Sequence, residues 1–217
     1  MEQQPGRKLS RREQARLEDF QRLSGQMRQQ GYRRVDLVVD VVQANVMAVV
    51  VMLPFLAAAA VLFFALNPVG EVYIPFSGMA LWLLAFLVLV VLHEAIHGLT
   101  WGLMAPHGFK AIAFGVIWQM LTPYCTCNDG LKRWQYLLGG LMPTLILGFG
   151  LAGLATAQGS LWLFSLAEVM ILGGGGDFLV VFKMLRHPQK DGAVYYDHPY
   201  ECGMVVFEPE NGNVPAA

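Results

Sequence analysis

The chain has little charge and little cysteine. Charged residues are only 14% of its 217 residues, and 15 Lys and Arg nearly balance 16 Asp and Glu, which gives no indication of a nucleic-acid partner. Three cysteines are too few for a disulfide framework. Cys125 and Cys127 are one residue apart, too close for a usual Cys-x-x-Cys zinc pair, and Cys202 is expected to be a free thiol. The N-terminus also lacks the pattern of a signal peptide, so the apolar stretches further on are expected to be retained.

What the chain has in excess is apolar sequence. Hydrophobic residues make up 55% of it, a composition typical of a membrane protein. Each of four stretches is long enough, at about 20 residues or more, to cross a hydrocarbon core of about 30 Å. They are Val41–Leu66, Ser77–Met104, Tyr136–Ala157 and Leu161–Leu185. We therefore predict an all-α integral membrane protein with four transmembrane helices.

The distribution of Lys and Arg predicts the orientation of these spans. Residues 1–34 hold nine Lys and Arg against four acidic residues, and basic residues also follow the second and fourth spans. The loops at 67–76 and 158–160 contain none. Because Lys and Arg accumulate on the cytosolic side of a membrane, both termini are expected to be cytosolic, an N-in/C-in topology.

The segments outside the spans suggest further organisation. Residues 1–35 are expected to form a cytosolic amphipathic arm, 36–186 the membrane core and 187–217 a cytosolic tail. In the arm, Ser10 and Glu13 form a capping-box pattern, and apolar residues recur at helical spacing up to Met27. This helix could lie on anionic lipid or be a solvated arm that only sets the topology.

The segment Phe109–Tyr124, after the second span, is apolar but too short and too broken to cross a membrane. It is rich in β-branched and aromatic residues and is interrupted by Gly115 and Pro123. A short re-entrant or β-hairpin-like segment is expected here.

The second span contains the motif His93-Glu94-Ala95-Ile96-His97. On a helix, His93 and His97 are one turn apart and leave the same face, so both imidazoles can bind one Zn²⁺. Glu94 beside them can act as a general base. Three polar groups at membrane depth are costly without a function, which favours a catalytic metal site over chance.

A catalytic zinc ion usually takes a third protein ligand, and Asp177 is the predicted one. It lies 16 residues into the fourth span, as His93 lies 16 residues into the second, so both are about 24 Å deep. The glycines before Asp177 are expected to let this span press against Gly98 and Gly102 of the second. Glu168 is the rival ligand, although it faces roughly the opposite side of a straight helix. His107 and His198 lie outside the spans and are expected at the surface.

These residues predict a zinc-dependent, membrane-embedded peptidase. Metal-activated water would attack the peptide bond of a membrane protein or membrane-associated peptide, with Glu94 moving the proton. The segment Phe109–Trp118 could hold the substrate by strand addition. The alternative is a non-catalytic membrane protein whose structural or regulatory metal site supports binding of a partner protein. A hydrolase or transporter acting on something other than peptides is a third hypothesis.

Several motifs between Leu92 and Phe207 carry a family resemblance. They are His93-Glu94-x-x-His97-Gly98, Pro123–Cys127, Gly140-x-x-Pro143, Gly174-Gly175-Gly176-Asp177, and Asp197-His198-Pro199 followed by Gly203. The chain resembles the site-2 type intramembrane zinc proteases, and more closely the DUF3267-type family of small bacterial membrane proteins described as zincin peptidases. The resemblance implies zinc ligands at His93, His97 and Asp177, a catalytic Glu94, and a bacterial cytoplasmic membrane. In the expected topology, a depth of about 24 Å from the outer ends of the spans places the site toward the cytosol. The chain departs from the site-2 pattern at two positions. Gly140 stands where that pattern has Asn, and Phe178 stands where that pattern has Gly after the Asp.

Overall fold

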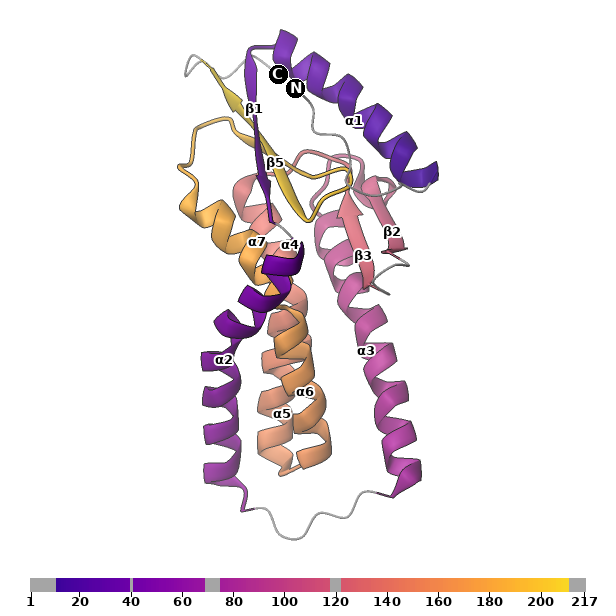
Figure 1. Ribbon diagram of the computed structural model, residues 1–217, viewed down its shortest axis with the longest axis vertical. Coiled ribbons are helices and arrows are strands. Elements are labelled where there is room, and N and C mark those ends of the chain that lie inside the picture. Colours follow the sequence, from indigo (N-terminus) through magenta and orange to yellow (C-terminus); the bar gives the residue numbers. More distant parts are fainter. Residues whose placement is uncertain (1–10, 40, 69–74, 118–121, 211–217) are drawn as a thin grey trace.

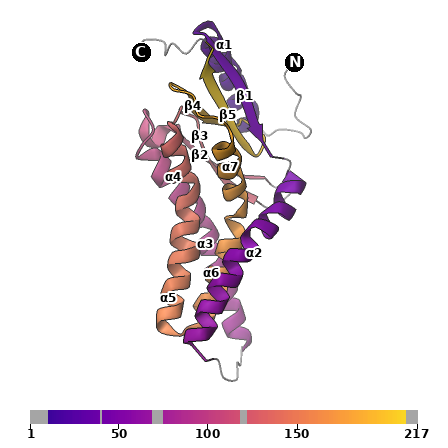
Figure 2. The ribbon, with the colours of Figure 1, turned by 90° about the vertical axis from the view of Figure 1, so that its left-hand side faces the viewer.

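The protein is elongated, with long helices at one end and two small sheets at the other (Figure 1). The computed structural model describes residues 11–39, 41–68, 75–117 and 122–210. Seen from the side, the sheets and the N-terminal helix form a cap above the long helices (Figure 2). This separation follows the sequence, because the long apolar stretches form the helices and the basic, more polar segments form the cap.

Four helical segments are long and apolar enough to cross a membrane, which confirms the four predicted spans. The first two are single helices, and each of the last two is divided into successive elements. The segments are α2 (Val41–Leu66); α3 (Phe76–Gly102); α4 (Arg133–Pro143), the π-helical η2 (Thr144–Gly150) and α5 (Leu151–Gln158); and α6 (Leu161–Gly173) with α7 (Gly175–Arg186).

The surfaces of α2 and α3 fit a bilayer rather than water. Large apolar side chains are exposed on both helices, among them Val61 and Phe64 on α2 and Leu84 and Val91 on α3. A soluble monomer rarely exposes so large a contiguous apolar surface. Four such helices are consistent with a membrane protein.

Glycines set the packing between segments, although not between the pair expected. An added Cβ at Gly174 would lie 1.8 Å from Thr144 Oγ1, and one at Gly175 would lie 2.7 Å from Ala48 Cβ. The fourth segment therefore presses against the third and the first. Gly98 and Gly102 on α3 instead accommodate rings of Phe114 and Phe109, so the expected glycine contact between the second and fourth spans is wrong. The rings of Phe114 and Phe109, which follow the second span, occupy the space beside these two glycines.

Two antiparallel sheets complete the fold. The cap sheet has the strand order β1 (Tyr32–Val38), β5 (Gly203–Pro209), β4 (Val194–Asp197). A hairpin of β2 (Ile112–Ile117) and β3 (Thr122–Cys127) follows a 3-10 turn, η1 (Gly108–Ala111), after the second span, as expected. The protein is mostly helical, but the all-α class was incomplete. The missing strands belong to the two termini, and their pairing is too distant in sequence to be read locally.

The N-terminal helix α1 (Arg11–Gln29) covers the cap sheet. Phe20 and Met27, on its predicted apolar face, are buried against Val205 and Phe207 of β5. We expected this face to lie on lipid or in solvent, but it packs against protein, because β5 offers a complementary apolar face. Ser10 lies outside the described residues. The division at residues 35/36 and 186/187 stays a prediction, although β1 runs across the first boundary and pairs with β5.

A buried carboxylate on β5 joins the cap to the end of the fourth segment. Glu208 is 1% exposed and accepts hydrogen bonds from Arg33 on β1 (3.0 Å), from Lys190 (2.9 Å) and from His187 at the end of α7. Burial alone would raise the pKa of Glu208, but these three donors outweigh it and lower the pKa to about 2. The carboxylate is thus held ionised as a junction between sheet and helix.

Candidate metal centre

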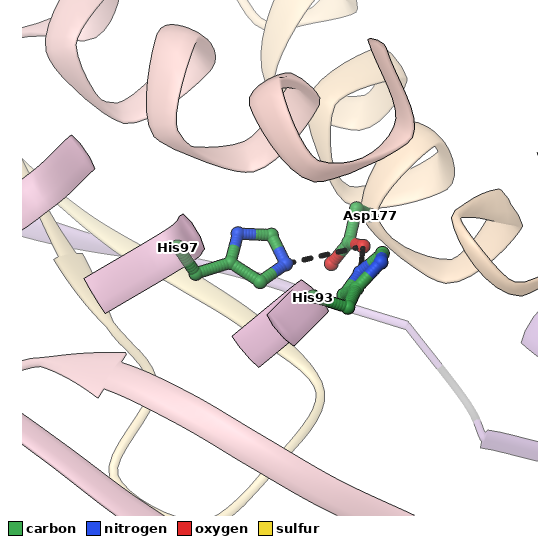
Figure 3. Close-up of side chains that lie close together, drawn as sticks. All are labelled: His93, His97 and Asp177. Atoms are coloured by element: carbon green, nitrogen blue, oxygen red, sulfur yellow. Dashed lines mark hydrogen bonds and ion pairs between the residues drawn. The ribbon is translucent and has the colours of Figure 1, made fainter. Parts of the chain in front are cut away.

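Helix α3 directs two imidazoles toward one point (Figure 3). They lie in the half of α3 that is nearer the cap of sheets and α1. His93 and His97 are one turn apart, and their ring centroids are 5.0 Å apart. Both are buried, with His97 only 3% exposed. Burying two imidazoles costs free energy unless their nitrogens are paired or bind a metal.

The third member of the cluster comes from the fourth segment. Asp177 is in the first turn of α7, and its Oδ2 lies 3.1 Å from His93 Nε2 and 3.4 Å from His97 Nε2 (Figure 3). Among the described residues, the ligand atoms of these three side chains lie within 4.8 Å of one another, close enough to bind one metal ion. Glu168 does not belong to this cluster. The structure thus brings together the three residues predicted as ligands.

The orientation of His97 is determined by α4. Its Nδ1 lies 2.8 Å from the carbonyl oxygen of Gly139, which can only accept, so Nδ1–H donates and Nε2 is the nitrogen directed at Asp177. Trp101 stacks on the His97 ring at 5.1 Å between centroids. An added Cβ at Gly139 would lie 1.9 Å from Trp101 Nε1, so glycine is required for this close approach. A carbonyl partner of this kind is the usual outer support of a metal-binding imidazole.

The donor set fits a zinc ion. Two imidazoles and one carboxylate are common zinc ligands, and ligand atoms about 2.0–2.1 Å from a tetrahedral ion would be about 3.3 Å apart. The two Nε2–Oδ2 distances, 3.1 and 3.4 Å, agree with that spacing. His93 Nδ1 is buried and has no hydrogen-bond partner within the described part of the chain. The three residues could therefore hold a metal ion.

Glu94 lies next to this cluster without belonging to it. It follows His93 on α3, it is half-buried, and the backbone N–H of Cys125 on β3 faces its carboxylate. The hairpin thus contributes to the site. Burial raises the pKa of the Cys125 thiol well above its ordinary value, and the carboxylates of Asp197 and Glu94 act in the same direction. Cys125 therefore stays a neutral thiol and is not suited to be a nucleophile.

The two remaining predicted histidines differ from each other. His107 is exposed and paired with Asp129 at 2.8 Å, as expected for a surface residue. His198 is buried, which corrects the expectation that it lies at the surface. The turn between β4 and β5 encloses it, and its Nδ1 accepts a hydrogen bond from the backbone N–H of Glu201 (3.0 Å). Burial lowers the pKa of His198 to about 4, so it is neutral at physiological pH.

One polar junction that the sequence analysis did not identify supports the site from the cap. Asp197 at the end of β4 accepts hydrogen bonds from the Tyr136 hydroxyl (2.5 Å) and from the backbone N–H of Cys127 (2.7 Å). It thereby joins α4, which orients His97, to β3, which faces Glu94. The signal available was an Asp in the Asp197-His198-Pro199 motif, but its partners are 61 and 70 residues away.

The fold and site combine four helical segments long and apolar enough to cross a membrane with a His/His/Asp cluster near one end of them, an arrangement consistent with a membrane protein that binds a metal ion. Residues 86–191 match the model of the DUF3267 family, whose description is "Putative zincin peptidase". Over these residues, just under half of its length, the chain is similar to this family. The match includes the whole cluster, Glu94 and the hairpin, and it ends before the Asp197-His198-Pro199 motif. Among curated proteins and solved structures, no match to the chain was found.

Proposed function

We propose that the protein is a zinc-dependent, membrane-embedded peptidase that cleaves membrane proteins or membrane-associated peptides. In this proposal His93, His97 and Asp177 hold the zinc ion and Glu94 is the general base. The observation that carries it is that the three side chains, from α3 and α7, converge on one point. Glu94 directly follows one of them, His93, in the sequence. The family description, which names a zincin peptidase, supports the same chemistry.

The chain's own groups divide the work of hydrolysis. A bound zinc ion supplies a water of lowered pKa and polarises the peptide carbonyl. The Glu94 carboxylate takes the proton from the attacking water and delivers it to the leaving amine nitrogen. The Gly139 carbonyl keeps the proton of His97 on Nδ1, so that Nε2 remains a ligand. Trp101 limits rotation of that imidazole by stacking on it.

The hairpin is proposed to hold the substrate in an extended form. We assign the strand-addition surface to β3, because β3 is the strand whose Cys125 N–H faces Glu94. The Phe109–Trp118 segment, where we first expected it, contributes β2, which is paired with β3. A substrate carbonyl that accepts from Cys125 N–H would bring the neighbouring peptide bond to Glu94 and free the carboxylate to act as a base.

The N-in/C-in topology, with the site toward the cytosol of a bacterial cytoplasmic membrane, is part of this proposal. The cap contains α1 and β1, which both carry Arg residues, and further basic residues lie in the last turn of α7 and in the segments after α3 and α7. These segments lie at one end of the helices (Figure 1). Basic residues concentrated at one end favour a cytosolic location for that end.

The first experiment is to measure zinc in the full chain purified in detergent. Wild type and Glu94→Gln are expected to contain about one zinc ion per chain, because Glu94 is not a ligand. His97→Ala and Asp177→Ala are expected to lose it. Asp129→Ala is a matched control, since Asp129 pairs with His107 away from the cluster. Absence of zinc from folded wild type, even after zinc is supplied, would refute the metal site.

Activity then separates a catalytic from a structural metal. Cleavage of fluorescein-labelled casein in detergent is expected for wild type and is expected to be lost in Glu94→Gln while zinc is kept. If the Glu94→Gln protein retains full activity and full zinc, Glu94 is not the base. If zinc binds and removal of Glu94 changes nothing measurable, the structural-metal hypothesis gains support.

A further inference from the structure

A pocket separate from the metal centre opens at the cap end of the spans. It has a volume of about 500 Å³ and lies between the start of α4 and the chain that follows α7. Its lining combines Lys132, Arg133 and Lys190 with the apolar Trp134 and Leu137, and one acidic residue, Asp191.

The positive charge of this pocket is incompletely neutralised by the protein. The hydrogen-bond partners of Arg133 in the described part of the chain are uncharged: the side-chain oxygen of Gln189 (3.2 Å) and the carbonyl oxygens of Met184 (3.0 Å) and Leu185 (3.2 Å). These bonds fix the guanidinium in place at the last turn of α7. Lys132 is exposed at the start of α4. Lys190 is paired with Glu208, and Asp191 offsets only one of the remaining charges.

The apolar side of the pocket points to a membrane ligand. Trp134 is in the first turn of α4, where the third span begins, and its side chain is 57% exposed. Leu137, one turn further into the span, lines the same pocket. Exposed Trp at the end of a span is typical of the membrane interface, and basic pockets there bind anionic headgroups. Cations on the cap side and apolar groups on the membrane side match a phosphate with attached acyl chains.

We propose that this pocket binds the phosphate headgroup of an anionic glycerophospholipid, with Trp134 and Leu137 against its acyl chains. The headgroup lies between Lys132 and Arg133, at the point where α4 meets the end of α7. Bound there, the lipid bridges the third and fourth segments, the same segments that supply Gly139 and Asp177 to the metal centre. The site needs no zinc and no peptidase activity, so it stands or fails independently of the proposed function.

The test uses the full chain in vesicles of phosphatidylcholine that contain phosphatidylglycerol with brominated acyl chains. Bromine quenches a nearby tryptophan, and the difference between wild type and Trp134→Phe isolates the signal of Trp134. Quenching is expected to saturate at a several-fold lower fraction of brominated phosphatidylglycerol than of brominated phosphatidylcholine. Removing one lysine charge near the headgroup, in Lys132→Gln, is expected to reduce this preference about fivefold.

The controls determine whether the pocket is responsible. Lys110→Gln removes an exposed cation of η1, outside the pocket, and is expected to keep the full preference. Because Arg133 also holds α7, Lys132→Glu is the second pocket variant, and it is expected to abolish the preference without disturbing those bonds. Equal quenching by both lipids in wild type would overturn the proposal. So would an equal loss in Lys110→Gln, which would indicate general attraction to the cap, or displacement by millimolar inorganic phosphate, which would indicate a site for free phosphate.

Discussion

Replacing Gly139 by alanine is expected to weaken the metal centre from outside it. Gly139 contributes no side chain, but its carbonyl accepts from His97 Nδ1 and its Cα packs against the indole of Trp101. An added Cβ would lie 1.9 Å from Trp101 Nε1 and 2.2 Å from Cδ1, closer than real contacts allow. Either the indole or α4 must move. Both movements disturb His97, because Trp101 stacks on it and Gly139 orients it.

The structure allows the size of the effect to be worked out. Overpacking a filled interior costs about 1–3 kcal/mol. Disturbing the outer partner of a metal-binding imidazole typically lowers metal affinity about 10–100-fold, which corresponds to about 1.4–2.8 kcal/mol. Gly139→Ala should therefore bind zinc at least about tenfold more weakly than wild type. Its unfolding temperature should also fall.

The assay is competition for zinc against a chromophoric chelator, with the full chain in detergent. Gly153→Ala is the matched control, because an added Cβ there meets nothing within 4 Å. Gly140→Ala is an intermediate case, since its Cβ would lie 3.1 Å from a methyl group of Val181. The reasoning would be refuted if Gly139→Ala bound zinc as tightly as Gly153→Ala and melted at the same temperature.

Three further predictions concern stability. Tyr136→Phe removes the hydroxyl that donates to buried Asp197, so it should lower the free energy of unfolding by about 1–3 kcal/mol in a denaturant titration, and an unchanged midpoint would contradict this. The folded-state pKa of Glu208 is about 2, below its ordinary value of 4.5, so its ionised carboxylate adds stability above pH about 4.5 that is lost as the pH falls toward 2. Over that interval the unfolding temperature of Glu208→Gln should fall less than that of wild type. An equal fall in both proteins would contradict this prediction. Zinc chelation should lower the unfolding temperature of wild type but not of His97→Ala, and equal effects would show that the chelator acts elsewhere.

The membrane spans and the two histidines could be predicted because each depends on neighbouring residues. Hydropathy over about 20 residues marks a span whatever it packs against. The i, i+4 spacing places His93 and His97 on one face of any helix. Asp177 required one further step, the comparison of depth between two spans, and the structure places its carboxylate 3.1 Å from His93. Its role as a ligand stays a prediction for the zinc measurement.

Other features escaped because they depend on partners far along the chain. Residues 32–38 become a strand only by pairing with residues 203–209. The apolar face of α1 is buried on the latter strand, β5. His198 looked like a surface residue because it lies outside the spans. A tight turn buries it and satisfies its Nδ1 locally, which no hydropathy pattern reports.

By itself, the sequence determined that four apolar helical segments form, that His93 and His97 lie one turn apart on the same face of one of them, and that Glu94 follows His93 directly. Those properties follow from local chain geometry and from the transfer of apolar side chains out of water. The tertiary structure alone decided that the Gly139 carbonyl orients His97, that the Cys125 N–H faces Glu94, and that Asp197 joins α4 to β3. These contacts connect residues 31 to 70 positions apart, so they exist only once the helices, the hairpin and the cap have packed.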